Sequence, residues 1–492
     1  MSELLLAVLL LAPILGGLVA WSRRGRVAER VAQVSFVPVA GAGLLLAGIV
    51  LVDGPRVAFG GLVVLDALGA YLLAVTIAVA ALALGASPRY VRHEIAAGLL
   101  RQRDEGRYYA LLLGFVASLV AVPLLDNLGL LWVAIEATTI ISALLVGITR
   151  TPEAIEAAWK YLVLGTVGVG FALLATILAY ASSVSVLGES SDALNWTRLV
   201  SIAPSLDSNL MRLAFVFALT GYGTKAGLVP FHTWLPDAHS QAPSPISGLL
   251  SGASLAAGLY ALVRFHLVAM GALGPEFSVT LLIVFGLLSL AVALPFMVAQ
   301  EDLKRLLAYS SIEHMGLLTL GIGFGGPIAL IGVVLHVGLH ALLKTTLFVA
   351  AGELVQQYGT RRLSRLRGAL ADAPVTAGAL GAGIFFLGGL PPSGVFVTEF
   401  AIIVGGVLRG YNLAAALAAV LVALSFVAMA FHGTHILWGK SVPGITFGRP
   451  GRGMGVLLGM PLAVVAVLGV WNPGLVQDIL ATVGAVLGGG RG

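Results

Sequence analysis

Long apolar runs follow one another along almost the whole chain, separated by short polar segments. Each run has about 20 residues, the length that an α-helix needs to cross the hydrocarbon core of a bilayer. The pattern therefore predicts an all-α polytopic membrane protein, since a transmembrane β-barrel would show alternating segments of about ten residues. The fourteen predicted spans lie near residues 4–20, 31–52, 61–85, 107–124, 128–148, 157–181, 209–229, 244–270, 278–299, 306–324, 327–354, 374–408, 413–438 and 454–471. A last apolar stretch, 474–488, is expected to form an amphipathic tail.

Composition supports this interpretation. Of 492 residues, 59% are apolar and 10% are charged, whereas a soluble domain has about 25% charged residues. Cysteine is absent, so we expect no disulfide and no cysteine-ligated metal or iron–sulfur cluster in this chain. No linker is long enough to separate soluble domains, so 1–492 is predicted to be one transmembrane domain. Its expected parts are 1–106 with three spans, 107–270 as a first repeat, 278–438 as a second, and 454–492 with the last span and tail.

The basic residues are distributed unevenly between the loops. Of the 28 lysines and arginines, 20 fall in odd-numbered loops, from Arg23 and Arg24 in the first to Arg449 in the last; the tail holds Arg491. The positive-inside rule then places odd loops in the cytoplasm and both termini on the outer side of the plasma membrane.

Two spans contain glycine and proline clusters that interrupt a helix. Span 7 carries Gly227 and Pro230, and span 12 carries Pro391 and Pro392. Proline removes a backbone hydrogen bond, and in lipid the freed groups must face protein or water. The two broken spans are five helices apart, which predicts two five-helix repeats, spans 4–8 and 9–13. An odd repeat length makes them inverted relative to each other.

Two charged residues of the first repeat lie at membrane depth. Glu136 is in the middle of span 5, and Lys225 is at the break in span 7. Charges at that depth cost several kcal/mol unless they are paired or hydrated, so we expect the two to be partners. A static ion pair is the alternative, but buried pairs contribute little to stability, which favours a functional role.

Span 11 carries His336, His340 and Lys344 at positions i, i+4 and i+8. This spacing aligns them on one helical face, and three protonatable groups in a row suit a proton relay. The alternatives are histidines bonded to backbone in the core, or a haem site shared with His314. Two histidines on one helix without a nearby carboxylate are an incomplete ligand set, so no metal site is predicted.

The remaining candidates lie in spans 8, 10 and 12. Glu399 follows the second break by about one turn, where it is either a relay group or a carboxylate facing the amides of a helix start. Glu313 and His314 are adjacent on span 10, and we expect them to point away from each other rather than into one cavity. Span 8 offers only Ser251 and Ser254. Without a nucleotide fold or nucleophile triad, movement of protons is the predicted chemistry, with no cofactor bound here and no nucleic-acid partner.

Two motifs carry a family resemblance. Residues 225–239, KAGLVPFHTWLPDAH, and 242–247, APSPIS, resemble the signature of the antiporter-like membrane proteins of respiratory complex I, Mrp-type cation/proton antiporters and group 4 hydrogenases. Segments 131–139, 304–316 and 340–348 are most similar to the branch that contains the F component of hydrogenase-4.

The resemblance implies roles for four residues. Glu136 and Lys225 match a pair whose separation favours proton release, while Lys344 and Glu399 match the groups that pass the proton across. It also implies partner membrane subunits and a peripheral redox arm that holds Ni–Fe, iron–sulfur or flavin centres, because this chain has no redox centre. Relatives often carry a lysine or histidine in span 8; its absence here leaves serines and water for that step. The expected function is a proton-translocating subunit of a membrane oxidoreductase. An Mrp-type sodium/proton antiporter subunit and a non-transporting scaffold are the alternatives.

Overall fold

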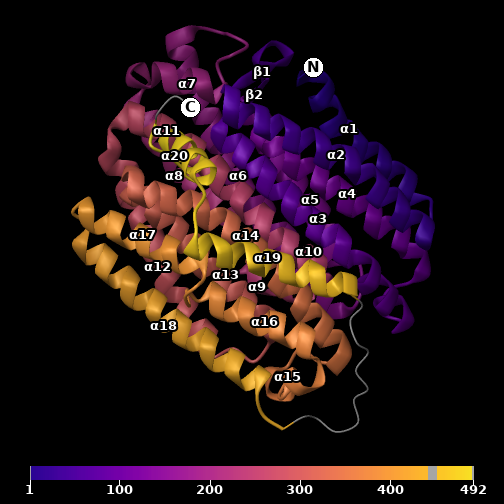
Figure 1. Ribbon diagram of the computed structural model, residues 1–492. Coiled ribbons are helices and arrows are strands. Elements are labelled where there is room, and N and C mark those ends of the chain that lie inside the picture. Colours follow the sequence, from indigo (N-terminus) through magenta and orange to yellow (C-terminus); the bar gives the residue numbers. More distant parts are fainter. Residues whose placement is uncertain (1, 441–451, 490–492) are drawn as a thin grey trace.

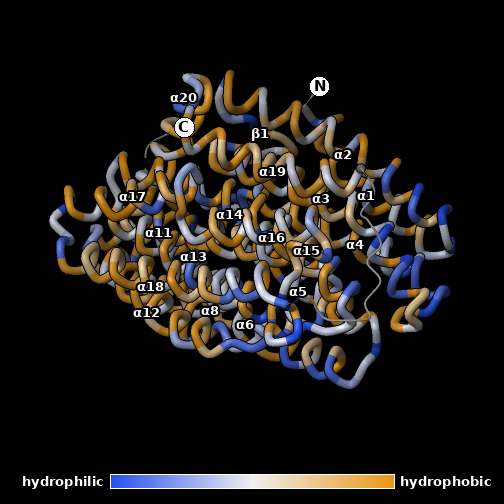
Figure 2. The backbone as a smooth tube through the Cα atoms, turned by 60° about the horizontal axis from the view of Figure 1, so that its bottom comes forward, coloured by the Kyte–Doolittle hydropathy of each residue, from blue (hydrophilic) through white to orange (hydrophobic). Residues whose placement is uncertain are grey.

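The computed structural model describes residues 2–440 and 452–489, and nearly all of them belong to helices that run side by side (Figure 1). Arg449 and Arg491, two of the basic residues considered above, lie outside the described residues. In the hydropathy view, apolar segments run along the helices and hydrophilic segments concentrate in the connections (Figure 2). This is the distribution that a bilayer imposes on spanning helices.

The long helices follow the predicted spans closely. Those of the N-terminal half are α1 (Ser2–Trp21), α2 (Arg26–Asp53), α3 (Ala67–Ala96), α4 (Glu105–Ala121), α5 (Leu128–Val146), α6 (Pro152–Leu187), α8 (Ser208–Ala226), α9 (Trp234–Gln241), α10 (Ser244–Leu249) and α11 (Leu255–Leu273). Those of the C-terminal half are α12 (Pro275–Val298), α13 (Leu303–Phe324), α14 (Gly326–Tyr358), α16 (Pro374–Leu387), α17 (Gly394–Leu408), α18 (Asn412–Leu437), α19 (Arg452–Val470) and α20 (Gly474–Leu487). Shorter pieces are α7 (Trp196–Ile202), α15 (Ala369–Asp372) and the 3₁₀ turns Phe59–Gly61, Gln102–Asp104, Val122–Leu124, Ala203–Ser205 and Leu363–Arg365.

Within the described part of the chain, eleven helices are long and apolar enough to cross a membrane. The two helices α8 and α13 and the broken pair α16 and α17 complete the fourteen predicted spans. Both α8 and α13 carry polar residues that face the interior, which is why their mean hydropathy is lower.

Two segments differ from the sequence prediction. Residues 61–66, expected at the start of span 3, belong instead to a hairpin of β1 (Arg56–Ala58) and β2 (Val63–Leu65), and α3 begins only after Asp66. The connection between the predicted spans 6 and 7, residues 182–208, is partly helical, because α6 continues to Leu187 and α7 occupies part of the remainder. Apolar β-branched residues such as Val63 and Val64 suit either a helix or a strand, so the pattern alone does not separate them.

Both predicted helix breaks are confirmed. After α8, Gly227 adopts a left-handed conformation (φ 77°) that ends the helix, and the chain turns before α9 begins. After α16, Gly389 also has a positive φ of 80°, and Ser393 then caps α17 by accepting a hydrogen bond from the amide of Val395. A third irregularity was not predicted: a π-helical segment, Leu250–Ser254, joins α10 to α11 inside span 8.

A buried ion pair fixes the end of the bundle that carries α7. Arg264 of α11 is fully buried and donates two hydrogen bonds to Asp66, at 2.6 and 2.8 Å. Its guanidinium lies 3.8 Å from the ring centre of Trp196 in α7. The cluster therefore ties α3, α7 and α11 together.

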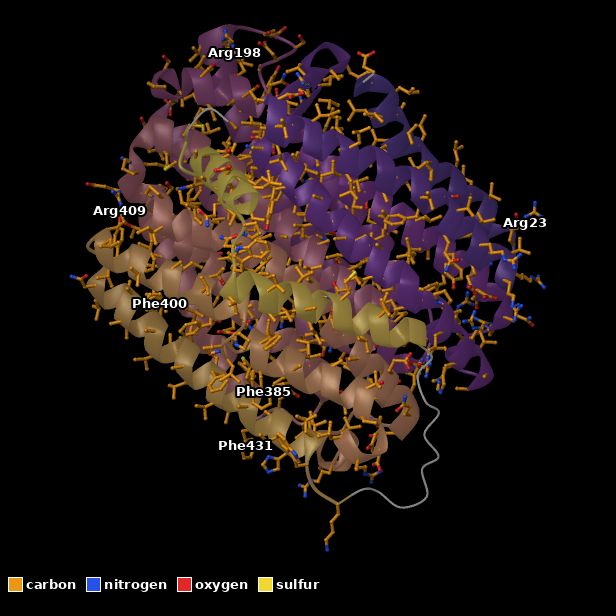
Figure 3. The ribbon with its side chains drawn as sticks, viewed as in Figure 1. Arg23, Arg198, Phe385, Phe400, Arg409 and Phe431 are labelled. Carbon is orange, nitrogen blue, oxygen red and sulfur yellow. The ribbon has the colours of Figure 1, made fainter. Side chains whose placement is uncertain are left out.

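The C-terminal helix and the basic residues complete the arrangement. The helix α20 packs its apolar face, including Leu480 and Val483, against α14 and α3, as expected for an amphipathic tail. Arg23 lies at one edge of the bundle, and Arg198 and Arg409 lie at the opposite edge (Figure 3).

Candidate functional site

Lys225 is held by neutral oxygens. It lies in the last turn of α8, directly before the Gly227 break, and only 1% of it is exposed. Its Nζ donates to Thr139 Oγ1 at 3.0 Å and to Tyr161 OH at 3.1 Å. Tyr161 in turn shares a 2.8 Å hydrogen bond with Ser142. The lysine head therefore enters a cluster of hydroxyl groups contributed by α5 and α6.

Glu136 and Lys225 form no direct ion pair among the described side chains, although the carboxylate still acts electrostatically on the lysine. Glu136 is half-buried, and its Oε1 accepts a hydrogen bond from Thr166 of α6 at 2.9 Å. The hydrogen bond from Lys225 is accepted instead by Thr139, one turn further along α5. The other carboxylate oxygen, Oε2, is buried without a hydrogen-bond partner among the described atoms, so the two charges interact without touching.

The short helix after the break packs on the ligands of Lys225. The indole of Trp234, the first residue of α9, stacks on Tyr161 with ring centres 4.4 Å apart. Its ring nitrogen donates to the carbonyl of Thr224 at 2.9 Å. On the other side Gly258 of α11 contacts the lysine, where a Cβ would lie 3.0 Å from Lys225 Cγ. The position of α9 thus sets the walls around the lysine.

Cations from other helices hold α9. Lys304 of α13 donates to the carbonyl of Ala242 at 2.5 Å, just beyond the end of α9, where carbonyl groups lack helical partners. Asp237 of α9 pairs with Arg305 at 3.1 Å and with Lys160 at 3.4 Å. These ion pairs and this hydrogen bond fix the position of α9 relative to α6 and α13.

The second half contains a buried line of histidines, as the spacing on span 11 predicted. His336 Nδ1 is 2.8 Å from Thr398 Oγ1 of α17, and its Nε2 is 3.1 Å from His314 Nδ1 of α13. The ring of His340 lies 5.3 Å from that of His314, and its Nε2 is buried without a hydrogen-bond partner in the described structure. The haem alternative placed His314 near these residues correctly, but the imidazoles bond each other rather than converge on a metal position.

Lys344 continues this face of α14. It is fully buried, and its Nζ donates to the carbonyl of Leu307 at 2.8 Å and to Ser310 Oγ. Both acceptors belong to α13, so the same two helices carry the lysine and the histidine line.

Glu313, His314 and Glu399 line one small cavity with Gly388 and Ser425. The expectation that Glu313 and His314 point apart is therefore wrong: their Oε2 and Nε2 atoms are 3.5 Å apart. Neighbouring positions on a helix diverge by about 100°, but both side chains are long enough to reach the space left by the interrupted span 12.

Glu399 lies directly over that interruption. A Cβ at Gly389 would overlap its Oε2 atom, so the carboxylate lies directly against this glycine, whose positive φ favours glycine there. The carboxylate is therefore positioned by the break itself rather than only by the start of α17.

Serine residues connect the two halves. Ser251 in the π-helical segment shares a 2.8 Å hydrogen bond with Ser311 of α13, while Ser254 Oγ is buried without a partner among the described atoms. Sequence reasoning selected the charged residues and the serines of span 8 but not Thr139 or Tyr161. A single hydroxyl is common in membrane helices, and its role becomes specific only when the helices are packed.

The site is a succession of groups able to bind and release protons, bridged by hydroxyls. Of the residues that the structure describes, no group of three or more histidine, aspartate and glutamate side chains could hold a metal ion. Imidazole and hydroxyl groups both donate and accept, so a chain of them conducts protons without a bound cofactor.

Comparison with known proteins places this arrangement in a wider group. Residues 126–425 match the model of a family described as NADH:quinone oxidoreductase/Mrp antiporter, transmembrane. The chain is 42% identical to the hydrogenase-4 component F homolog of Methylacidiphilum infernorum, over 68% of this chain and 70% of that protein. It is 34% identical to the NADH-quinone oxidoreductase subunit N of Desulforudis audaxviator, over 62% of this chain and 59% of that protein. A chain of the Mrp complex from Dietzia sp. DQ12-45-1b has the same fold, with a TM-score of 0.81, 22% identity, and 99% of this chain and 98% of that chain covered.

Proposed function

Because the chain belongs to the NADH:quinone oxidoreductase/Mrp antiporter family of membrane subunits, we propose that it translocates protons within a hydrogenase-like or complex I-like oxidoreductase. The observation that carries the proposal is the buried connection from His314 through His336 to Thr398, next to Lys344 and the cavity of Glu399. A merely structural bundle would not keep so many titratable groups in hydrocarbon, where each is costly.

In the first half, the proton is bound and released at Lys225 Nζ. In the described conformation the ammonium is hydrogen-bonded by the hydroxyls of Thr139 and Tyr161, and the carboxylate of Glu136, which is bonded to Thr166, acts on it through space. Moving that carboxylate towards the lysine would favour the charged ammonium, and moving it away would favour release. Tyr161 and Ser142 offer the released proton its first acceptors.

In the second half, Lys344 and the histidines receive and forward the proton. His336 bonds on both ring nitrogens, so accepting a proton on one side and releasing one on the other leaves its position unchanged. Glu313 and Glu399 then accept the proton in the cavity at the break of span 12. Ser251, Ser311 and Ser254 bridge the two halves, with water completing the path.

The same proposal implies which subunits accompany this chain and in which membrane it lies. Chains with this fold occur in multisubunit membrane complexes, and we place this chain beside other membrane subunits of its own complex. Ni–Fe, iron–sulfur or flavin centres belong to a peripheral redox arm that drives transport. The membrane is the plasma membrane, with odd-numbered loops inside and both termini outside.

Sodium/proton exchange is the second candidate, since the family also includes Mrp antiporters. A sodium site needs several free oxygen ligands. Ser393 donates to the carbonyl of Phe386, and Thr398 is bonded to His336. These two hydroxyl oxygens at the second break are thus already engaged, which favours protons.

Proton uptake into vesicles that contain the purified complex tests the proposal. Lys344→Met should abolish uptake while electron transfer continues at a reduced rate, and Lys440→Met, a surface change, should leave uptake unaltered. Uptake that survives Lys344→Met would support the scaffold alternative, and uptake that requires sodium would support exchange.

A further inference from the structure

The helices α1 and α2 form one edge of the bundle in both views (Figures 1 and 2), and a groove opens between them. It is lined on α1 and α2 by small and apolar side chains, and has a volume of ≈ 1110 Å³ open to the surroundings. Its lining includes Leu15, Val19, Val27 and Val34, and the last of these is 69% exposed. None of these residues takes part in the proton path.

One end of the groove is strongly basic. Arg30 lines it directly, and Arg23, Arg24 and Arg26 lie in or beside the adjoining turn, all of them exposed. Figure 3 shows Arg23 projecting away from the bundle at this edge. Within the described structure none of the four has an ion-pair partner or a side-chain hydrogen bond.

The acidic residues near this turn are already engaged. Glu29 pairs with Arg92 at 2.7 Å, and Glu105 accepts a hydrogen bond from the amide of Gly25 at 2.7 Å. The positive charge of the four arginines is therefore left for a group that does not belong to this chain.

The dimensions of the groove fit one leaflet of a bilayer. Val27 and Pro38, the outermost lining residues on α2, are eleven residues apart, which corresponds to about 17 Å along a helix. Half of the hydrocarbon core of a bilayer is about 15 Å thick. A chain that starts at the arginines and follows the groove therefore ends near the midplane.

We propose that this groove is a binding site for an anionic phospholipid of the leaflet that contacts the turn between α1 and α2. The phosphate lies between Arg30 and Arg26, because guanidinium groups bind phosphate oxygens in a bidentate manner. One acyl chain lies along Leu15, Val27 and Val34. The charge at the rim selects the lipid over a neighbouring apolar helix, which would leave the arginines without counter-charge.

Binding is measured by native mass spectrometry on the intact complex, titrated with phosphatidylglycerol or with phosphatidylcholine of the same chain length. We expect phosphatidylglycerol to be retained preferentially. Arg26→Gln combined with Arg30→Gln should weaken that binding about tenfold, since each basic side chain near an anionic headgroup contributes appreciably. Arg365→Gln, an exposed arginine after α14 without an ion pair in the described residues, is the matched control and should have no effect.

A second variant tests the acyl chain without touching the charges. Val34→Trp fills the groove and should reduce retained lipid, although all four arginines remain. Equal binding of both lipids, or unchanged binding in both groove variants, would overturn the proposal. So would a photo-crosslinker at position 34 that captures a neighbouring protein chain instead of lipid. No turnover is measured, so the result is independent of whether the chain moves protons.

Discussion

The two halves of the bundle hold their buried lysines in different ways. In the first half, Lys225 contacts two hydroxyls, and Glu136 is bonded to Thr166 without a direct contact to the lysine. In the second half, Lys344 lies on the same helix face as a line of imidazoles that already contact each other. The first half therefore depends on a movement that brings its charges together, whereas in the second half His314, His336 and Thr398 are already hydrogen-bonded to one another. The step that controls the rate is expected in the first half.

Loss of Lys225 should have the largest effect, matched only by the loss of Lys344. Lys225→Met removes the proton carrier but keeps the side-chain volume and the Tyr161–Ser142 hydrogen bond, so proton uptake should fall about 100-fold or more while the fold persists. Uptake is measured in vesicles, and the fold by thermal melting of the purified complex.

Arg264→Met is the matched comparison, because Arg264 is also a fully buried cation but is paired with Asp66. Its loss leaves an uncompensated carboxylate and should destabilise the protein by about 3–5 kcal/mol. If Lys225→Met lowered the melting temperature as much as Arg264→Met, Lys225 would have a structural role like that of Arg264 and would not be a proton carrier.

The histidine line should be less sensitive than the first lysine. His336→Phe removes the bonds to His314 and Thr398 together, and we expect uptake to fall about tenfold, as for the loss of one acid–base group among several. His435→Gln, an exposed histidine of α18, should have no effect. A loss as complete as that of Lys225→Met would show that both halves limit the rate equally.

Neutralising the carboxylate of the first half should have a moderate effect. Glu136→Gln can still accept from Thr166 but no longer attracts the lysine, so uptake should fall about fivefold, equivalent to about 1 kcal/mol. Glu153→Gln, at the exposed start of α6, is the control. Normal uptake in Glu136→Gln would mean that Lys225 works without a partner.

The smallest effect should come from the hydroxyl that holds this carboxylate. Thr166→Val frees Glu136 to approach Lys225, and we expect uptake to rise about twofold, because a single hydrogen bond contributes about 0.5–1.5 kcal/mol. A decrease in uptake would indicate that the Thr166–Glu136 hydrogen bond is needed for proton transfer. The initial rate of dye-detected acidification distinguishes the two outcomes.

The sequence predicted the spans and both helix breaks well because these depend on local physics. A run of apolar residues is committed to the bilayer by its own transfer free energy, and Gly227, Pro230, Pro391 and Pro392 interrupt hydrogen bonds within their own segments. The π-helical turn at Leu250–Ser254 escaped prediction because its residues suit an ordinary helix. What distinguishes it is packing: Gly252 lies against α14, where a Cβ would be 2.9 Å from the carbonyl of Ala341.

The sequence by itself also determined which groups carry the candidate chemistry. A charge within a hydrocarbon-spanning segment is expensive wherever its side chain points, so Glu136, Lys225, Lys344 and Glu399 can be selected without a structure. Only the tertiary structure decided their partners. Thr139 rather than Glu136 meets the lysine, and His314 comes from another helix to meet His336. Such contacts depend on how each helix is rotated about its axis, and that rotation is set by packing between residues far apart in the chain.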